Sequence, residues 1–192
     1  MKAYYDARAP EYDDWYDGAG GFAERDRPGW VEELATLERA LGSLTPARTL
    51  DVACGTGYLT RWLPGEVVGL DQSDGMLAIA RGRLPEATLV KADALEPLPF
   101  PDGAFDRVFT GHFYGHLDPA VLTRFLAEAR RVARELVVVD SAGSGEEVED
   151  RVLSDGTRWE VYKRWFTPET LLAELGGGRT LHHGTYFVAV AS

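Results

Sequence analysis

Short apolar runs alternate with helical patterns through the middle of the chain. The runs predicted to be strands are 49–52, 67–70, 88–91, 105–110 and 136–139. The segments predicted to be helices are 58–63, 74–82 and 119–133. Asp118 and Pro119 form a favoured cap and first position for the last of these helices. Strands that alternate with helices predict an α/β fold, with a doubly wound parallel sheet covered on both faces.

The C-terminal part departs from this alternation. Thr167 and Pro168 begin a predicted helix that stops at the glycines 176–178. Residues 179–183 and 185–191 are predicted strands around Gly184, close enough in sequence to form an antiparallel hairpin.

The glycine-rich stretch 50–59, LDVACGTGYL, is the most informative part of the sequence. Gly55 and Gly57 can take positive φ and let the backbone approach a ligand closely. Such a turn between a parallel strand and a helix is typical of a nucleotide-type binding site. A dinucleotide fingerprint would need a third glycine where Thr60 stands, and a phosphate-binding loop would need a Gly-Lys-Ser/Thr triplet that the chain lacks.

Acidic residues also end the next two predicted strands. Asp71 follows Gly55 by 16 residues and is placed to accept two hydrogen bonds from a ribose diol. Asp93 ends the third run and is placed to accept a hydrogen bond from an adenine amino group. Together with Asp51, these acids place three carboxylates in register at strand ends. Three such residues are hard to explain as side chains that only face solvent.

Taken together, these segments resemble the class I S-adenosylmethionine-dependent methyltransferases of the small-molecule type, which includes the ubiquinone and menaquinone biosynthesis methyltransferases. The matching segments, in the family's order and spacing, are 51–57, 71–73, 76–81, 92–94 and 98–108. The resemblance implies a Rossmann-like, doubly wound sheet of seven strands, mostly parallel with an antiparallel last strand, and an N-terminal helical lid. It also implies the cofactor S-adenosyl-L-methionine and the product S-adenosyl-L-homocysteine.

The candidate cofactor residues lie on the glycine turn, at the strand ends and on the N-terminal segment. They are Asp51, Ala53, Cys54, Gly55, Thr56, Gly57, Asp71, Gln72, Met76, Asp93, Ala94, Leu95, Gly111, Tyr5 and Arg8. The resemblance supplies the roles of Tyr5 and Arg8, because the family's N-terminal segment folds over the methionine part of the cofactor. Cys54 has no base near it in sequence, so we expect it to pack as a small apolar residue.

Two segments outside the central core are expected to hold the methyl acceptor. We divide the single domain into an N-terminal helical cap (1–45), a cofactor-binding core (46–140), a substrate-side insertion (141–166) and a C-terminal helix with hairpin (167–192). The aromatic and basic candidates for acceptor binding are Tyr12, Trp15, Tyr16, Tyr114, Trp159, Tyr162 and Arg164.

His112 and His116 are the candidate general bases. They leave the carboxyl end of the fourth predicted strand, where open α/β sheets bind ligands, and an imidazole titrates near neutrality. The alternative is that these histidines only pack against the cofactor or the next helix. A base is needed only when the acceptor must lose a proton, because methyl transfer depends mainly on alignment.

Composition narrows the function further. A net charge of −11 argues against a nucleic-acid substrate, and 45% hydrophobic content in 192 residues fits one domain. One cysteine excludes an internal disulfide and fits a reducing, cytoplasmic location. We find no signal-peptide pattern, membrane span or metal-ligand spacing.

The leading hypothesis is a methyltransferase that acts on a small molecule as a monomer or homodimer. A cofactor-binding protein without catalysis and a methyltransferase for protein side chains are the alternatives. The sequence leaves open whether oxygen, nitrogen or carbon is methylated.

Overall fold

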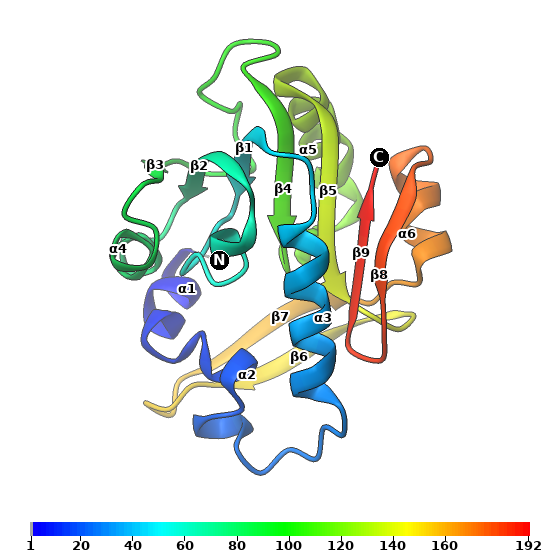
Figure 1. Ribbon diagram of the computed structural model, residues 1–192. Coiled ribbons are helices and arrows are strands. Elements are labelled where there is room, and N and C mark those ends of the chain that lie inside the picture. Colours follow the sequence, from blue (N-terminus) through cyan, green and yellow to red (C-terminus); the bar gives the residue numbers. More distant parts are fainter. Residues whose placement is uncertain (1) are drawn as a thin grey trace.

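The computed structural model describes residues 2–192 and has a seven-stranded sheet at its centre (Figure 1). The strands are β1 (Ala47–Val52), β2 (Gly65–Asp71), β3 (Thr88–Lys91), β4 (Phe105–Gly111), β5 (Ala133–Ser141), β8 (Arg179–His183) and β9 (Phe187–Ala191). Their order is β3-β2-β1-β4-β5-β9-β8. The strands β1 to β5 are parallel to one another, and β9 is antiparallel to both β5 and β8. The predicted fold class is therefore confirmed.

Helices cover both faces of this sheet. They are α1 (Lys2–Arg8), α2 (Asp14–Asp17), α3 (Trp30–Gly42), α4 (Asp74–Arg83), α5 (Pro119–Val132) and α6 (Pro168–Leu175). The first two form the N-terminal segment, which lies beside α4 and the carboxyl ends of the strands (Figure 1). As predicted, Asp118 caps α5, and Thr167 caps α6.

The core has two halves because successive strand residues point to opposite faces. Val137 and Val139 of β5 pack with α3, whereas Leu136 and Val138 pack with α5 and α6. All four side chains are fully or almost fully buried. Such continuous burial is expected for a central strand covered on both sides.

A separate two-stranded hairpin crosses the molecule near the carboxyl ends of the parallel strands (Figure 1). Its antiparallel strands are β6 (Glu146–Val152) and β7 (Arg158–Arg164). Burial alternates along β7, with Val161 and Lys163 buried. The sequence analysis missed β6, because its charged residues resemble an exposed loop.

Two predicted elements are shorter than expected. The predicted helix 58–63 is a single 3-10 turn, Thr60–Trp62, because Pro64 and the start of β2 at Gly65 leave no room for a longer helix. The last strand begins at Phe187 rather than at Thr185. The Glu33 carboxylate of α3 accepts hydrogen bonds from the backbone N–H groups of Thr185 and Tyr186 and so holds them in the turn.

Within residues 2–192, no helix combines the length and the apolar character that crossing a membrane would require.

Candidate active site

A small pocket opens at the carboxyl ends of β1, β2 and β4. Its lining comes from the glycine turn, the strand ends and the N-terminal segment: Tyr5, Tyr12, Ala53, Gly55, Asp71, Gln72, Met76, Ala94, Gly111, His112 and Phe113. Ala53 and His112 both have positive φ, 60° and 55°. Non-glycine residues held in this region are strained, and such strain concentrates at functional sites.

The two glycines of the turn have different roles. A Cβ at Gly55 would point into the pocket, with its nearest neighbours, Tyr12 and Met76, 3.8 and 4.0 Å away. A Cβ at Gly57 would lie 2.6 Å from a methyl carbon of Leu84. Gly55 therefore leaves room for a ligand, whereas Gly57 lets the turn pack against the end of α4.

Asp71 lines the pocket at the end of β2 and also organises the turn. Its Oδ2 accepts a hydrogen bond from the Gly55 N–H at 2.9 Å, and its Oδ1 accepts one from the Ser73 N–H at 2.8 Å. Burial raises the pKa of this carboxyl, and the same backbone N–H groups oppose the rise. Each carboxylate oxygen keeps a further lone pair, so the group can still accept hydrogen bonds from a ligand diol.

Asp51 lies beneath the turn and does not line the pocket. It is 1% exposed, and its Oδ2 accepts a hydrogen bond from the Thr60 hydroxyl at 2.5 Å. Its Oδ1 has no partner among the described residues. Burial raises the pKa of Asp51 to about 8, against the opposing effect of the Thr60 hydrogen bond.

The predicted cofactor residues divide into two groups according to whether they line the pocket. Those that line the pocket are Tyr5, Ala53, Gly55, Asp71, Gln72, Met76, Ala94 and Gly111. Those that do not are Arg8, Asp51, Cys54, Thr56, Gly57, Asp93 and Leu95. Asp93 is exposed and accepts a hydrogen bond from the Leu95 N–H at 2.9 Å, so its carboxylate shapes the turn after β3 instead. Cys54 packs against Gly69, as expected for a small apolar residue.

Carboxylates of the N-terminal segment fasten it to the turn and to α4. Asp13 accepts hydrogen bonds from Thr56 and from Arg83, both at 2.6 Å. Asp6 accepts one from the Ser73 hydroxyl at 2.6 Å. These contacts hold the N-terminal segment, residues 2–21 and here called the lid, beside the pocket, which its Tyr5 and Tyr12 help to line.

A wide, open cleft adjoins the pocket and lies between the lid and the β6–β7 hairpin. Tyr5, Tyr12 and His112 line both spaces, so they mark the place where the two meet. Trp15 also lines the cleft, and its ring meets the His112 ring edge-on at a centroid distance of 4.6 Å.

His112 is the better placed of the two candidate bases. It is 9% exposed, and its Nε2 is buried and has no hydrogen-bond partner among residues 2–192. Its Nδ1 lies 3.8 Å from Oδ1 of the fully buried Asp140. Burial lowers the pKa of His112, and the Asp140 carboxylate opposes this effect, so the imidazole is neutral at pH 7.

His116 lines the cleft but not the pocket. Its Nδ1 lies 2.7 Å from the carbonyl oxygen of Tyr162, which can only accept, so Nδ1 carries the proton. Burial and the nearby positive charges of Lys163 and Arg151 lower the pKa of His116 to about 3. A base this weak is poorly matched to proton transfer near neutral pH.

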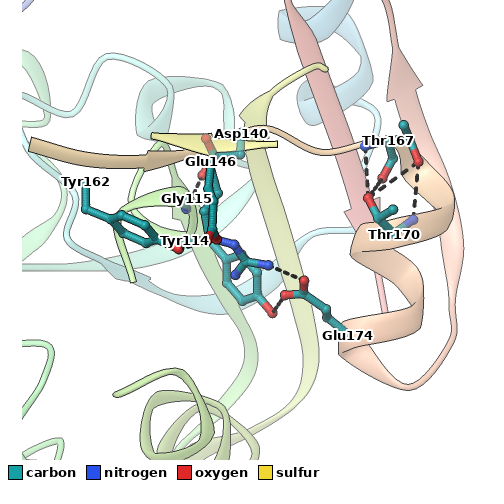
Figure 2. Close-up of polar contacts among 9 residues, drawn as sticks. Tyr114, Gly115, Asp140, Glu146, Tyr162, Thr167, Thr170 and Glu174 are labelled. Carbon is teal, nitrogen blue, oxygen red and sulfur yellow. Dashed lines mark hydrogen bonds and ion pairs between the residues drawn. The ribbon is translucent and has the colours of Figure 1, made fainter. Parts of the chain in front are cut away.

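Several residues predicted to bind the acceptor instead make contacts within the protein, which corrects the sequence analysis. Tyr114 is fully buried and donates a hydrogen bond to Glu174 at 3.0 Å, and Tyr162 donates one to Glu146 at 2.6 Å (Figure 2). Arg164 forms an ion pair with the same Glu174. These bonds use the polar groups that were expected to meet an acceptor, and none of the three residues lines the cleft.

Tyr16 and Trp159 also lie outside both spaces. Tyr16 is 4% exposed and stacks on Tyr58 at a centroid distance of 4.0 Å, so the aromatic spacing that suggested acceptor binding reflects core packing. Trp159 packs against Tyr4 of the lid. Of the predicted acceptor residues, Tyr12 and Trp15 remain in the cleft.

The sequence analysis missed Asp140 and Lys163. Their side chains form a buried ion pair with a distance of 2.5 Å, and Lys163 lines the cleft. Asp140 follows the apolar run of β5, the signal that identified Asp51, Asp71 and Asp93. A lysine on the apolar face of an alternating strand could also have indicated a buried partner.

Comparisons with known proteins agree with this geometry. The methyltransferase domain family matches residues 50–137, which contain the glycine turn, Asp71 and β4. A demethylmenaquinone methyltransferase from Beutenbergia cavernae is 41% identical over 103 residues, covering 52% of this chain and 41% of that protein. A trans-aconitate 2-methyltransferase from Methylobacterium nodulans is 42% identical over 89 residues, covering 43% of this chain and 33% of that protein. The chain thus spans less than half the length of these relatives.

Solved structures extend the likeness to almost the whole chain. A DhpI–SAM–HEP complex is 25% identical, with a TM-score of 0.78, and the match covers 99% of this chain and 94% of that one. A DhpI–SAH complex is 27% identical, with a TM-score of 0.76, and the match covers 98% and 92%. The family match to residues 50–137 and the likeness to these two structures support a class I S-adenosylmethionine-dependent methyltransferase.

Proposed function

We propose that this chain binds S-adenosylmethionine in the pocket and transfers its methyl group to a small molecule in the adjoining cleft. The observation that carries the proposal is the shared border of the two spaces, formed by Tyr5, Tyr12 and His112. A cofactor in the pocket and an acceptor in the cleft would meet at this border. Alignment of the two reactants there would supply much of the rate acceleration.

The residues of the pocket fit this cofactor. The space in front of Gly55 admits a ligand that a Cβ would exclude, and Asp71 offers carboxylate oxygens to a ribose diol. Met76 and Ala94 provide an apolar surface for a flat base. When bound, the cofactor supplies a methyl group on a positively charged sulfur, which an acceptor atom can attack directly.

His112 is the proposed general base. It lies at the border, is neutral at pH 7 and has a buried Nε2 without a hydrogen-bond partner among the described residues. The lid and the β6–β7 hairpin lie within the expected cap (1–45) and substrate-side insertion (141–166), and they would enclose the acceptor. Their aromatic residues Tyr12 and Trp15 favour an aromatic or apolar acceptor.

A small-molecule acceptor is supported by the relatives, which are named for methyl transfer to demethylmenaquinone and trans-aconitate. Because the chain matches less than half of each relative, neither acceptor is assigned to it. A cofactor-binding protein without catalysis would have the same pocket, so turnover distinguishes the two proposals. A methyltransferase for protein side chains would methylate peptides in preference to small molecules.

Two measurements test the proposal. Calorimetry should show that S-adenosylmethionine and S-adenosylhomocysteine bind at micromolar concentrations. Chromatography should then detect S-adenosylhomocysteine formed with members of a panel of small phenols, acids and amines. Absence of binding would refute the proposal. Binding without turnover across both the small-molecule and the peptide panels would favour the protein without catalysis.

A further inference from the structure

His112, Asp140 and Lys163 come together from three separate segments of the chain. His112 follows β4, Asp140 lies near the end of β5, and Lys163 belongs to β7 of the hairpin. All three are at most 9% exposed. Burying charged groups is costly unless they are paired, so this cluster needs an explanation beyond surface electrostatics.

Asp140 is held firmly in place. Its Oδ2 accepts a hydrogen bond from the Gly115 N–H at 2.7 Å, and its Oδ1 accepts one from the Ser141 N–H at 2.8 Å. Lys163 Nζ donates to the same Oδ1 at 2.5 Å. Burial alone would raise the pKa of Asp140, but the Lys163 ammonium holds it well below its usual range, so Asp140 is ionised.

The imidazole of His112 is oriented toward this carboxylate. Nδ1 is the ring nitrogen near Asp140, and the backbone N–H of His112 donates to the Val139 carbonyl of β5 at 2.8 Å. The 3.8 Å separation is longer than a hydrogen bond, but catalytic contacts of this kind are often long before ligands bind and shorten in the complex. His112 also has a positive φ of 55°, and strained backbone of this kind concentrates at functional sites.

We propose that Asp140 is a positioning residue that keeps the proton of His112 on Nδ1, which leaves Nε2 to accept a proton from the acceptor. Lys163 partly neutralises the charge of Asp140. This inference rests on the proposed function. The acceptor is then a molecule with an O–H or N–H group at the atom that is methylated. The bond from the methyl carbon to oxygen or nitrogen forms as the carbon–sulfur bond breaks, and the electron pair stays on sulfur. The acceptor proton moves to Nε2 and leaves later to water.

The charges around His112 predict opposite effects for two substitutions. The groups that face it are Asp140 from β5, Lys163 from β7, Arg8 from α1 and the Tyr16 phenol from α2. Asp140→Asn removes the anion that stabilises the imidazolium, so the pKa of His112 should fall. Lys163→Met removes the cation that offsets Asp140, so the same pKa should rise. Each shift should be roughly one pH unit.

Nitrogen-15 NMR of the histidine rings measures both the proton position and the pKa, without any turnover. The chain has 4 histidines, and a His112→Gln variant assigns the signal. We expect the Nδ1–H form in the unmodified protein and shifts of opposite sign in the two variants. Lys91→Met is the matched control, because Lys91 forms an exposed ion pair with Asp74 at the end of β3, and it should leave the His112 signal unchanged.

Shifts of the same sign, or no shift, would overturn the proposal and make the ion pair a structural one. If either single variant fails to fold, the double variant Asp140→Asn/Lys163→Met decides, because it leaves no unpaired charge. We expect this variant to lose the preference for the Nδ1–H form, and retention of that preference would overturn the proposal. Calorimetry with S-adenosylhomocysteine on the same samples tests the proposed function separately, so the two failures can be distinguished.

Discussion

The pocket and the cleft are built in different ways. The pocket is built around the glycine turn and the ends of the strands, which contribute Gly55, Gly111 and the carboxylate of Asp71. The cleft wall is made of long side chains from two segments outside the sheet, the lid and the β6–β7 hairpin. A backbone cradle needs glycines and acids at fixed spacings, whereas a wall of side chains can be built from many residue types.

This difference explains why the pocket was predicted better from the sequence than the cleft. The glycine turn and the acids at strand ends have a sequence signature, because their positions relative to the strands are set by the fold. An aromatic residue in the lid has no such signature. Tyr12 reaches the cleft and Tyr16 enters the core, although both belong to the same aromatic segment.

The substitution with the largest expected effect tests the backbone cradle. Gly55→Val should reduce the affinity for S-adenosylhomocysteine by at least about 100-fold, because the branched side chain would fill the pocket and strain a φ of 55°. Calorimetry measures the affinity, and circular dichroism should stay native-like. Gly103→Val is the matched control, since Gly103 has a φ of 64° and no atom within 4 Å of a Cβ. Equal binding by both variants would mean that the turn is only structural.

Asp71→Ala should weaken cofactor binding by at least about tenfold, because a carboxylate hydrogen-bonded to a ligand contributes ~1.5–3 kcal/mol for each bond. Asp93→Ala should have a smaller effect, since Asp93 is exposed and does not line the pocket. Calorimetry on both variants measures the ranking. The reverse order would show that Asp93 turns into the pocket when the cofactor binds.

The lid should respond to the cofactor more than the sheet does. The helices α1 and α2 have 7 and 4 residues, too few to be stable alone, and polar contacts hold them in place. Hydrogen exchange should therefore show that amides of residues 3–21 become protected roughly tenfold or more on addition of S-adenosylhomocysteine. Amides of α3 provide the internal control. Equal protection with and without the ligand would mean that the aromatic residues of the lid are ordinary core residues.

Burial of neutral His116 should make stability depend on pH. Its pKa in the folded chain is lowered to about 3, whereas in the unfolded chain it is ~6.5. Between these two pH values His116 is protonated in the unfolded chain and neutral in the folded chain. Stability from this group is complete above pH ~6.5 and is lost as the pH falls. The side chain is only partly buried, so we expect a loss of about 1 kcal/mol between pH 7 and pH 5. Thermal unfolding of a His116→Gln variant should show a weaker pH dependence, and an unchanged slope would exclude His116 as its source.

The sequence predicted most of the sheet because periodicity reports burial directly. The run 88–91 matches β3 residue for residue, and 105–110 falls one residue short of β4. β6 was missed because its charged residues resemble an exposed loop, although Glu149 and Arg151 form an ion pair within the strand at 2.6 Å. The pairing of Asp140 with Lys163 is of another kind, because it joins two segments that come together only in the folded chain.

The substitution with the smallest expected effect tests whether Tyr114 is a structural residue that does not meet the acceptor. Tyr114→Phe removes the hydroxyl that donates to Glu174, which costs about 1 kcal/mol for a buried hydrogen bond. Glu174 keeps its ion pair with Arg164, so its carboxylate is not left without a partner and the cost should be at the lower end. Urea denaturation measures this loss, and Tyr162→Phe, whose bond to Glu146 is exposed, should cost less. The rate of S-adenosylhomocysteine formation should not change in Tyr114→Phe. A slower rate with unchanged stability would mean that Tyr114 meets the acceptor after the cleft rearranges, and the division between pocket and cleft would have to include it.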